Sequence, residues 1–251
     1  MILHLWWNTS WAWKTTESNT EKEAVGREQY VPCGGFVLKG SMMVSIILAS
    51  SSPRRRDLIG QMGWEPVLCK GNFSEIHTPE EGRGRMSLLP EAGQKELSRF
   101  SGPDFVTVFN AYGKGLDAAE KHAGESPVLS ADTVVSAEGR ILGKPADEGE
   151  AFAMLSFLSG RVHEVKTGIA LFYHGQVRLD CCTTRVYFRN LEKEEILAYI
   201  GTGEPMDKAG AYGIQGRGAV LVDHIEGDYN NVVGLPLTRV YEFLREWKAL
   251  G

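Results

Sequence analysis

The fold is decided by the stretch Leu48-Ala49-Ser50-Ser51-Ser52-Pro53-Arg54-Arg55-Arg56-Asp57-Leu58. It overlaps the run 44–48, which is short, mostly β-branched and apolar, and which therefore predicts a buried strand. Ser52 suits a helix N-cap, and Pro53 suits the first helical position, where the N–H that proline lacks has no partner anyway. The stretch thus predicts a strand, a serine-rich turn and a helix N-terminus.

The expected helix N-terminus is also a candidate anion site. Its free N–H groups and the positive end of the helix dipole attract negative charge. Arginines at 54–56 are unfavourable in a first turn, which prefers acids, unless an anion of high charge density such as a phosphate lies among them. The alternative is a solvated basic turn that happens to precede a helix.

The composition excludes several classes of protein. Of the 251 residues, 43% are hydrophobic and 24% are charged, as in a globular domain or one with two lobes. A net charge of -5 argues against nucleic-acid partners, and no apolar run approaches the roughly 18 residues that span a membrane. Cysteines without CxxC spacing argue against a disulfide framework or a zinc site and lead us to expect a cytoplasmic protein: Cys33, Cys69, Cys181 and Cys182.

Residues 1–41 differ in composition from the rest of the chain. They contain a short tryptophan-rich patch and then a polar run, an order that does not fit a signal peptide. We expect a disordered or non-native extension, with a true start at Met42 or Met43 and a single domain over 42–251. Within that domain, residues 76–104 are rich in Gly, Pro and charge, and they predict an inserted surface loop with one helical turn near Leu97.

The remaining chain predicts helices and strands in alternation. Helices are expected over about 105–119, 147–158, 194–200 and from 235 onward, and strands over 66–69, 128–135, 140–142, 162–173, 176–188 and 219–225. His163 and His174 have no second ligand at metal spacing, and we assign them structural or solvent roles. Residues 204–218 alternate glycines with Glu, Asp, Lys and Gln, which favours a binding loop over a plain glycine-rich loop.

The isolated charges point to phosphoanhydride chemistry. Asp132 interrupts an apolar strand, so burying it is costly unless a metal ion, an arginine or a dense set of donors lies beside it. Glu75 is a second isolated acid, and Lys114, Lys144 and Lys208 supply cations. Carboxylates with Mg²⁺, together with cations that grip phosphates, are the arrangement for attack of water on a phosphoanhydride.

Five ordered motifs resemble the Maf family of nucleoside triphosphate pyrophosphatases. They are LASSSPRR at 48–55, SADTVV at 130–135, GKP at 143–145, DKAGAYGIQG at 207–216 and NVVGLPL at 231–237. The resemblance covers about residues 44–247. It implies a mixed α/β fold, with a strongly curved central sheet flanked by helices and a cleft between two lobes. It also implies hydrolysis of a nucleoside triphosphate to monophosphate and pyrophosphate with a divalent cation, Mg²⁺ or Mn²⁺, and we expect a homodimer.

The resemblance further implies roles for individual residues. Asp132 matches the catalytic base, and Glu75 matches an acid that holds the metal together with Asp132. The polar and cationic positions that line the triphosphate cleft are matched by Ser50, Arg55, Lys114, Lys144 and Lys208.

Substrate preference is expected from three positions that separate branches of the family. Arg54, Thr133 and Gln215 resemble the branch acting on dTTP and UTP, whereas the branch favouring 7-methyl-GTP resembles Trp, Gln and Glu there. A small threonine and an amide that both donates and accepts suit the alternating edge of a pyrimidine. Two alternatives stay open, namely the 7-methyl-GTP preference and a non-enzymatic nucleotide-binding regulator of cell division.

Overall fold

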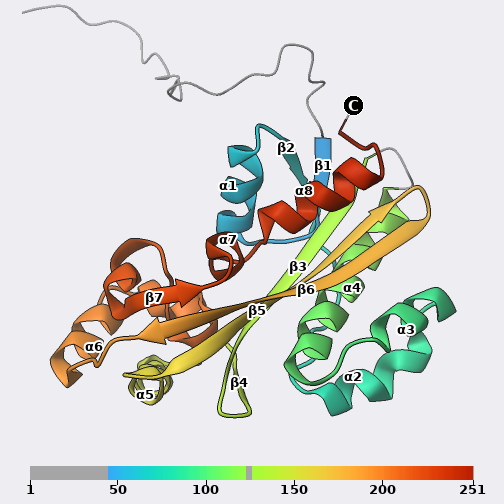
Figure 1. The fold of residues 1–251 in the computed structure, drawn as a ribbon. Helices are drawn as coiled ribbons and strands as arrows, with labels where there is room; N and C mark the ends of the chain where they lie inside the picture. Colours follow the sequence, from blue (N-terminus) through green and yellow to red (C-terminus); the bar gives the residue numbers. More distant parts are fainter. Residues whose placement is uncertain (1–44, 123–125, 251) are drawn as a thin grey trace, which may run out of the picture. The chain divides into compact units, whose positions relative to one another are not determined.

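The central feature of the fold is a mixed seven-stranded sheet. The computed structural model describes residues 45–122 and 126–250, in which the strand order is β2-β1-β3-β5-β6-β7 with β4 paired to β3 (Figure 1). The strands are β1 Ser45–Leu48, β2 Glu65–Leu68, β3 Val128–Ala137, β4 Arg140–Leu142, β5 Val162–Tyr173, β6 Gln176–Phe188 and β7 Val222–Glu226. β1 runs parallel to β2 and β3, whereas the other pairs are antiparallel.

Helices lie on both faces of this sheet, so the expected mixed α/β class is confirmed. They are α1 Pro53–Gln61, α2 Pro79–Arg85, α3 Glu91–Leu97, α4 Gly102–Lys121, α5 Glu148–Leu158, α6 Lys193–Ile200, α7 Tyr229–Val233 and α8 Leu237–Glu246. Short 3₁₀ segments connect some of them: Met86–Leu88, Glu204–Asp207, Ala209–Ala211 and Gly216–Leu221. Among the described helices, none is long and apolar enough to cross a membrane.

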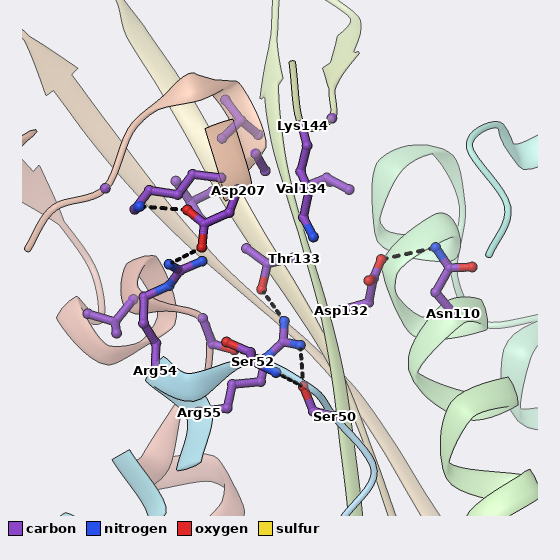
Figure 2. Close-up of a pocket in the computed structure, with 18 of the residues that line it drawn as sticks. Ser50, Ser52, Arg54, Arg55, Asn110, Asp132, Thr133, Val134, Lys144 and Asp207 are labelled. Atoms are coloured by element: carbon purple, nitrogen blue, oxygen red, sulfur yellow. Dashed lines mark hydrogen bonds and ion pairs between the residues drawn. The ribbon is translucent and has the colours of Figure 1, made fainter. Parts of the chain in front are cut away.

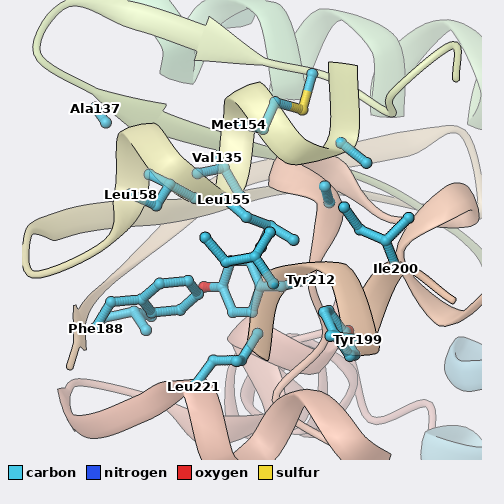
Figure 3. Close-up of a cluster of buried hydrophobic side chains, with 14 of the residues drawn as sticks. Val135, Ala137, Met154, Leu155, Leu158, Phe188, Tyr199, Ile200, Tyr212 and Leu221 are labelled. Carbon is cyan, nitrogen blue, oxygen red and sulfur yellow. The ribbon is translucent and has the colours of Figure 1, made fainter. Parts of the chain in front are cut away.

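The alternation of side chains along the strands divides the core into clusters. Ile169 and Leu171 pack with residues of α1 and α8, whereas Ala170 between them packs with α4. A third cluster, formed largely by α5, α6 and the adjoining ends of β3, β5 and β6, surrounds Tyr212 and Phe188 (Figure 3). Because successive strand residues face opposite sides, both faces of one strand can contribute to a site at its edge.

One edge of β3 is left partly unpaired. β5 pairs with β3 from Val128 to Ser136, while the opposite edge of β3 is paired only at its two ends. β1 pairs with β3 only as far as Leu129, and the pairing of β3 with β4 begins at Val135. Residues 130–134 therefore have no strand partner on this side within the described chain. The interruption leaves room for side chains from both faces to converge beside the end of β1.

Two of the expectations for local structure were wrong. The segment 76–104 is mostly helical, with α2 and α3 packed against α4 instead of an irregular loop. Its glycines explain the error, because Gly82 lies against Phe105 and Gly93 against Tyr112, where a side chain would not fit. The strand expected over 219–225 begins only at Val222, because residues 216–221 form a 3₁₀ segment. The expectation for residues 1–41 lies outside the described residues.

The serine turn is organised differently from the expected N-cap. Ser52 occupies the N-cap position of α1, but its side chain makes no capping hydrogen bond. Instead, its backbone N–H donates to Ser50 Oγ at 3.2 Å. Ser50 therefore orders the turn that leads into the helix.

The buried His163 predicts an acid-dependent loss of stability. Its Nε2 lies 2.7 Å from the Tyr212 hydroxyl, and burial lowers its pKa to about 4. Since the pKa is about 6.5 when unfolded, stability is full above that pH and falls as the pH drops toward 4. The linkage between protonation and folding predicts that the free energy of unfolding falls by about 2 kcal/mol between neutral pH and pH 5. Urea unfolding at pH 7.5 and pH 5 should show this loss in the wild type and less of it in His163→Gln. The exposed His224→Gln is the control, and an equal pH dependence in all three would contradict the prediction.

Candidate active site

A cavity of about 520 Å³ opens at the interrupted edge of β3 (Figure 2). It is lined by all ten residues for which the sequence predicts a role: Ser50, Arg54, Arg55, Glu75, Lys114, Asp132, Thr133, Lys144, Lys208 and Gln215. These residues come from segments that are far apart in the chain, and the fold brings them around one space. Cationic side chains and carboxylates both line it, as binding of a phosphate with a counter-ion requires.

Arg55 connects three parts of this site. Its Nε donates to the Gly234 carbonyl at 2.8 Å, Nη1 to Ser50 Oγ at 3.1 Å and Nη2 to Thr133 Oγ1 at 3.0 Å. Burial lowers the pKa of Arg55, and the nearby charge of Asp132 opposes this shift. The planar guanidinium thus fixes the N-terminus of α1 against β3 and the turn before α8.

The Thr133 hydroxyl donates one hydrogen bond and accepts another within the protein. Thr167 Oγ1 donates its proton to the Asn231 carbonyl at 3.1 Å. In the 2.9 Å contact between Thr133 Oγ1 and Thr167 Oγ1, Thr133 is therefore the donor. Thr133 Oγ1 also accepts a hydrogen bond from Arg55. The sequence-based expectation for Thr133 rests on the small size of its side chain beside a pyrimidine edge. In the structure this hydroxyl orients Arg55.

Two carboxylates on the opposite side share one lysine. Lys114 Nζ lies 2.7 Å from Asp132 Oδ1 and 2.9 Å from Glu75 Oε1. Among the described side chains, the cation beside Asp132 is thus a lysine and not an arginine, and with Asn110 it supplies two of the donors that the sequence leads us to expect. Burial alone would raise the pKa of Glu75, but Lys114 and, more weakly, Lys144 outweigh it, so the pKa lies below its usual range. Glu75 is therefore ionised at neutral pH.

The same two carboxylates are suitable ligands for a divalent cation. Within residues 45–122 and 126–250, no three His, Cys, Asp or Glu side chains gather at metal-binding spacing. Magnesium, however, is usually held by one or two protein carboxylates and by substrate phosphates, with no dedicated protein cage. The Glu75 side chain is 49% exposed and hence accessible, and Asp132 contacts the same lysine ammonium. This donor set fits Mg²⁺ or Mn²⁺ bound together with a phosphate.

Asp207 links the arginine turn to the glycine-rich segment, a contact that sequence reasoning missed. Arg54 Nη1 lies 3.0 Å from one oxygen of Asp207, and Lys208 Nζ lies 2.7 Å from the other. Burial would raise the pKa of Asp207, but Lys208 and Arg54 outweigh it and lower the pKa. The two cations therefore reach the cavity from opposite sides of one acid.

Glu204 is a second residue that sequence reasoning missed. Its carboxylate accepts from the Tyr199 hydroxyl at 3.0 Å and from the backbone N–H groups of Arg217 and Gly218 at 3.0 and 3.2 Å. Gln215 lies in the loop that these bonds close. The available signal was an acid at the start of the predicted binding loop, but its backbone partners lie 13 and 14 residues away and carry no local pattern.

Glu204→Gln is expected to loosen the loop that carries Gln215. One oxygen that accepts a backbone N–H becomes an amide donor, and bonds to a charged acceptor contribute about 1.5–3 kcal/mol each. The amides of Arg217 and Gly218 should exchange with solvent about tenfold faster or more, as measured by hydrogen–deuterium exchange. Glu194→Gln, on the first turn of α6, is the control. Unchanged exchange at both amides in Glu204→Gln would show that this carboxylate does not hold the loop.

Comparison with known proteins agrees with this geometry. The family described as Maf-like protein matches residues 45–247. A dTTP/UTP pyrophosphatase of Halalkalibacterium halodurans is 46% identical over 81% of this chain and 96% of its own. One from Thermococcus gammatolerans is 44% identical over 80% of this chain and 95% of its own. With the family match over most of its length and relatives of this similarity, the chain belongs to the Maf-like protein family.

Proposed function

We propose that this protein hydrolyses dTTP and UTP to the nucleoside monophosphate and pyrophosphate. The observation that carries the proposal is that one cavity is lined both by carboxylates, at 75 and 132, and by cationic residues, at 54, 55 and 208. The names of its relatives, dTTP/UTP pyrophosphatases, support the substrate class.

In the proposed reaction, Asp132 accepts a proton from a water molecule that attacks the α-phosphorus. The bond between this phosphorus and its bridging oxygen breaks, and pyrophosphate leaves with the electron pair. Arg54, Lys144 and Lys208 bind the phosphate oxygens and balance the charge that develops on them. Before substrate binds, Lys114 donates to Asp132 Oδ1 at 2.7 Å and orients the base.

A divalent cation, Mg²⁺ or Mn²⁺, would be held by Glu75 and Asp132 and would supply further neutralisation of the phosphate charge. The exposure of Glu75 and its ionisation at neutral pH support this assignment. We expect activity to be lost with a chelator and restored by adding Mg²⁺ or Mn²⁺.

Substrate preference is proposed to reside in Arg54, Thr133 and Gln215. Gln215 is exposed at the cavity wall, and its amide can donate to and accept from a pyrimidine edge. Thr133 acts through Arg55, because its hydroxyl is committed to that side chain and to Thr167. A bulkier residue at 133 would displace Arg55 and reshape the cavity.

The test is pyrophosphate release from a panel of nucleoside triphosphates with Mg²⁺ or Mn²⁺. Turnover concentrated on dTTP and UTP would support the proposal. Turnover of 7-methyl-GTP alone would support the pyrophosphatase activity but contradict the role proposed for the three specificity residues. If the folded protein binds nucleotide but releases no pyrophosphate, the alternative of a non-enzymatic nucleotide-binding regulator would be favoured.

We also propose that the protein is a cytoplasmic homodimer whose active unit is residues 42–251. The described cysteines, Cys69, Cys181 and Cys182, are free thiols, which is usual in a reducing compartment. Sedimentation of the full chain tests the dimer. Comparing the full chain with residues 42–251 in the pyrophosphate assay tests the extent of the active unit.

A further inference from the structure

A buried amide lies behind the proposed base. Asn110 is on α4, and only 2% of it is exposed. Its Nδ2 donates to Asp132 Oδ2 at 3.0 Å and to the Ile76 carbonyl at 3.0 Å, and its Oδ1 accepts from the Ile76 N–H at 2.8 Å. Figure 2 shows the Asn110 side chain directed at Asp132. All the hydrogen-bonding groups of this side chain except one lone pair are therefore used.

The backbone of Ile76 fixes which way this amide points. Oδ1 must face the N–H of Ile76, and one hydrogen of Nδ2 must face its carbonyl. The second hydrogen of Nδ2 is then directed at Asp132. In a flipped amide, Oδ1 would face the Ile76 carbonyl, acceptor against acceptor, and Nδ2 would face the Ile76 N–H, donor against donor. The peptide geometry alone therefore directs a donor at Asp132.

Asn110 and Lys114 act as a pair, because residues four apart lie on one face of a helix. Lys114 binds one oxygen of Asp132, and Asn110 binds the other. The same two side chains also hold the neighbouring segment, Lys114 through Glu75 and Asn110 through the backbone of Ile76. Both proposed metal-binding acids are thus positioned from one helix.

The two members of this pair differ in their freedom to move. Lys114 is shared between two carboxylates and lies at the cavity wall, where an arriving phosphate competes for its charge. Asn110 also lines the cavity, but it is buried and uncharged, and its three bonds go to the Ile76 backbone and to Asp132. Its hold on Asp132 therefore persists when Lys114 turns to the phosphates.

We propose that Asn110 is a positioning residue that orients the Asp132 carboxylate for proton abstraction during turnover. This inference rests on the proposed function, since it assigns Asn110 an effect through the base. It predicts that the rate of the chemical step depends on Asn110 while nucleotide affinity does not. It also predicts that the dependence disappears when residue 132 is no longer a base.

The experiment combines Asn110→Leu, which keeps the number and branching of the side-chain heavy atoms and removes all three bonds, with Asp132→Asn in a double-mutant cycle. The kcat for UTP should fall by about 10–100-fold in Asn110→Leu, the range seen when groups that orient active-site ligands are removed. Affinity for a non-hydrolysable UTP analogue should change less than threefold. In the Asp132→Asn background the same substitution should change kcat by less than about twofold.

Thr107→Val is the matched control, because Thr107 is fully buried one turn earlier on α4. Among the described residues, its hydroxyl contacts the Asp104 carbonyl and Cys181 Sγ and no group of the site. Its kcat should remain within about twofold of the wild type. Asn110→Asp serves if the leucine variant does not fold, since it retains the acceptor for Ile76 and loses the donor to Asp132. It should also lower kcat.

Two results would overturn the inference while leaving the proposed function in place. One is an unchanged kcat in Asn110→Leu or Asn110→Asp with an active wild type. The other is a loss of similar size in the Asp132→Asn background, which would mean that Asn110 only tethers Ile76. A folded wild type that releases no pyrophosphate would overturn the proposed function and this inference with it.

Discussion

Asp132→Asn is expected to slow pyrophosphate release from UTP by about 10²–10⁴-fold, the usual contribution of a general base. Asparagine keeps the volume at this buried position, so the fold should be preserved. It cannot accept the proton from water, and it leaves Lys114 paired with Glu75 alone. The measurement is steady-state release of pyrophosphate under saturating UTP and metal.

Asp117→Asn is the control for this substitution. Asp117 lies on α4, where it accepts from Lys121 and from the Asn72 N–H, and it does not line the cavity. Its rate should stay within about twofold of the wild type, because surface changes of this kind typically alter stability by less than about 0.5 kcal/mol. Near-normal turnover by Asp132→Asn would rule out this residue as the base.

Arg55→Lys is expected to lower the free energy of unfolding by about 2–4 kcal/mol, although the charge is retained. A lysine ammonium is a point donor and cannot span Ser50, Thr133 and Gly234 as the guanidinium does. At least one buried acceptor would be left without a partner, at a cost of about 1–3 kcal/mol in addition to the lost bonds. Urea unfolding at pH 7.5 measures the change.

The neighbouring Arg56→Lys controls for the loss of a guanidinium from the same turn. Arg56 is exposed, and the one ion pair that it forms with a described residue, Asp57, spans 3.6 Å. Its unfolding free energy should change by less than about 0.5 kcal/mol. Equal stability of both lysine variants would mean that the contacts of Arg55 do not hold α1 to β3. The kcat/KM for UTP should fall only in Arg55→Lys.

The sequence predicted secondary structure most accurately in segments where the hydrophobic pattern is long. Strands 162–173 and 176–188 are long and were predicted with the bounds that the structure shows. The segment 76–104 failed because its helices depend on packing against α4, and the glycines that permit this packing read as loop residues. Tertiary contacts there overrule local propensity.

The same distinction holds within the site. The ten predicted residues are the ones whose charge or motif is visible in the sequence, and all of them line the cavity. Asn110 and Glu204 act on backbone groups and side chains that only folding brings near. A buried asparagine within an apolar helical pattern carries no sign of its partner, since its hydrogen bonds reach across 22 and 34 residues.

The packing of α2 and α3 against α4 limits how far this protein can be shortened. Phe105 and Phe109 are buried together with Leu97 in a cluster to which Met86 and Leu89 also belong. Deleting residues 79–97 would expose this aromatic surface to water, and exposed apolar patches of that kind lead to aggregation. A trimmed version for expression or crystallisation would therefore need several aromatic residues of α4 replaced by polar ones before it stayed in solution.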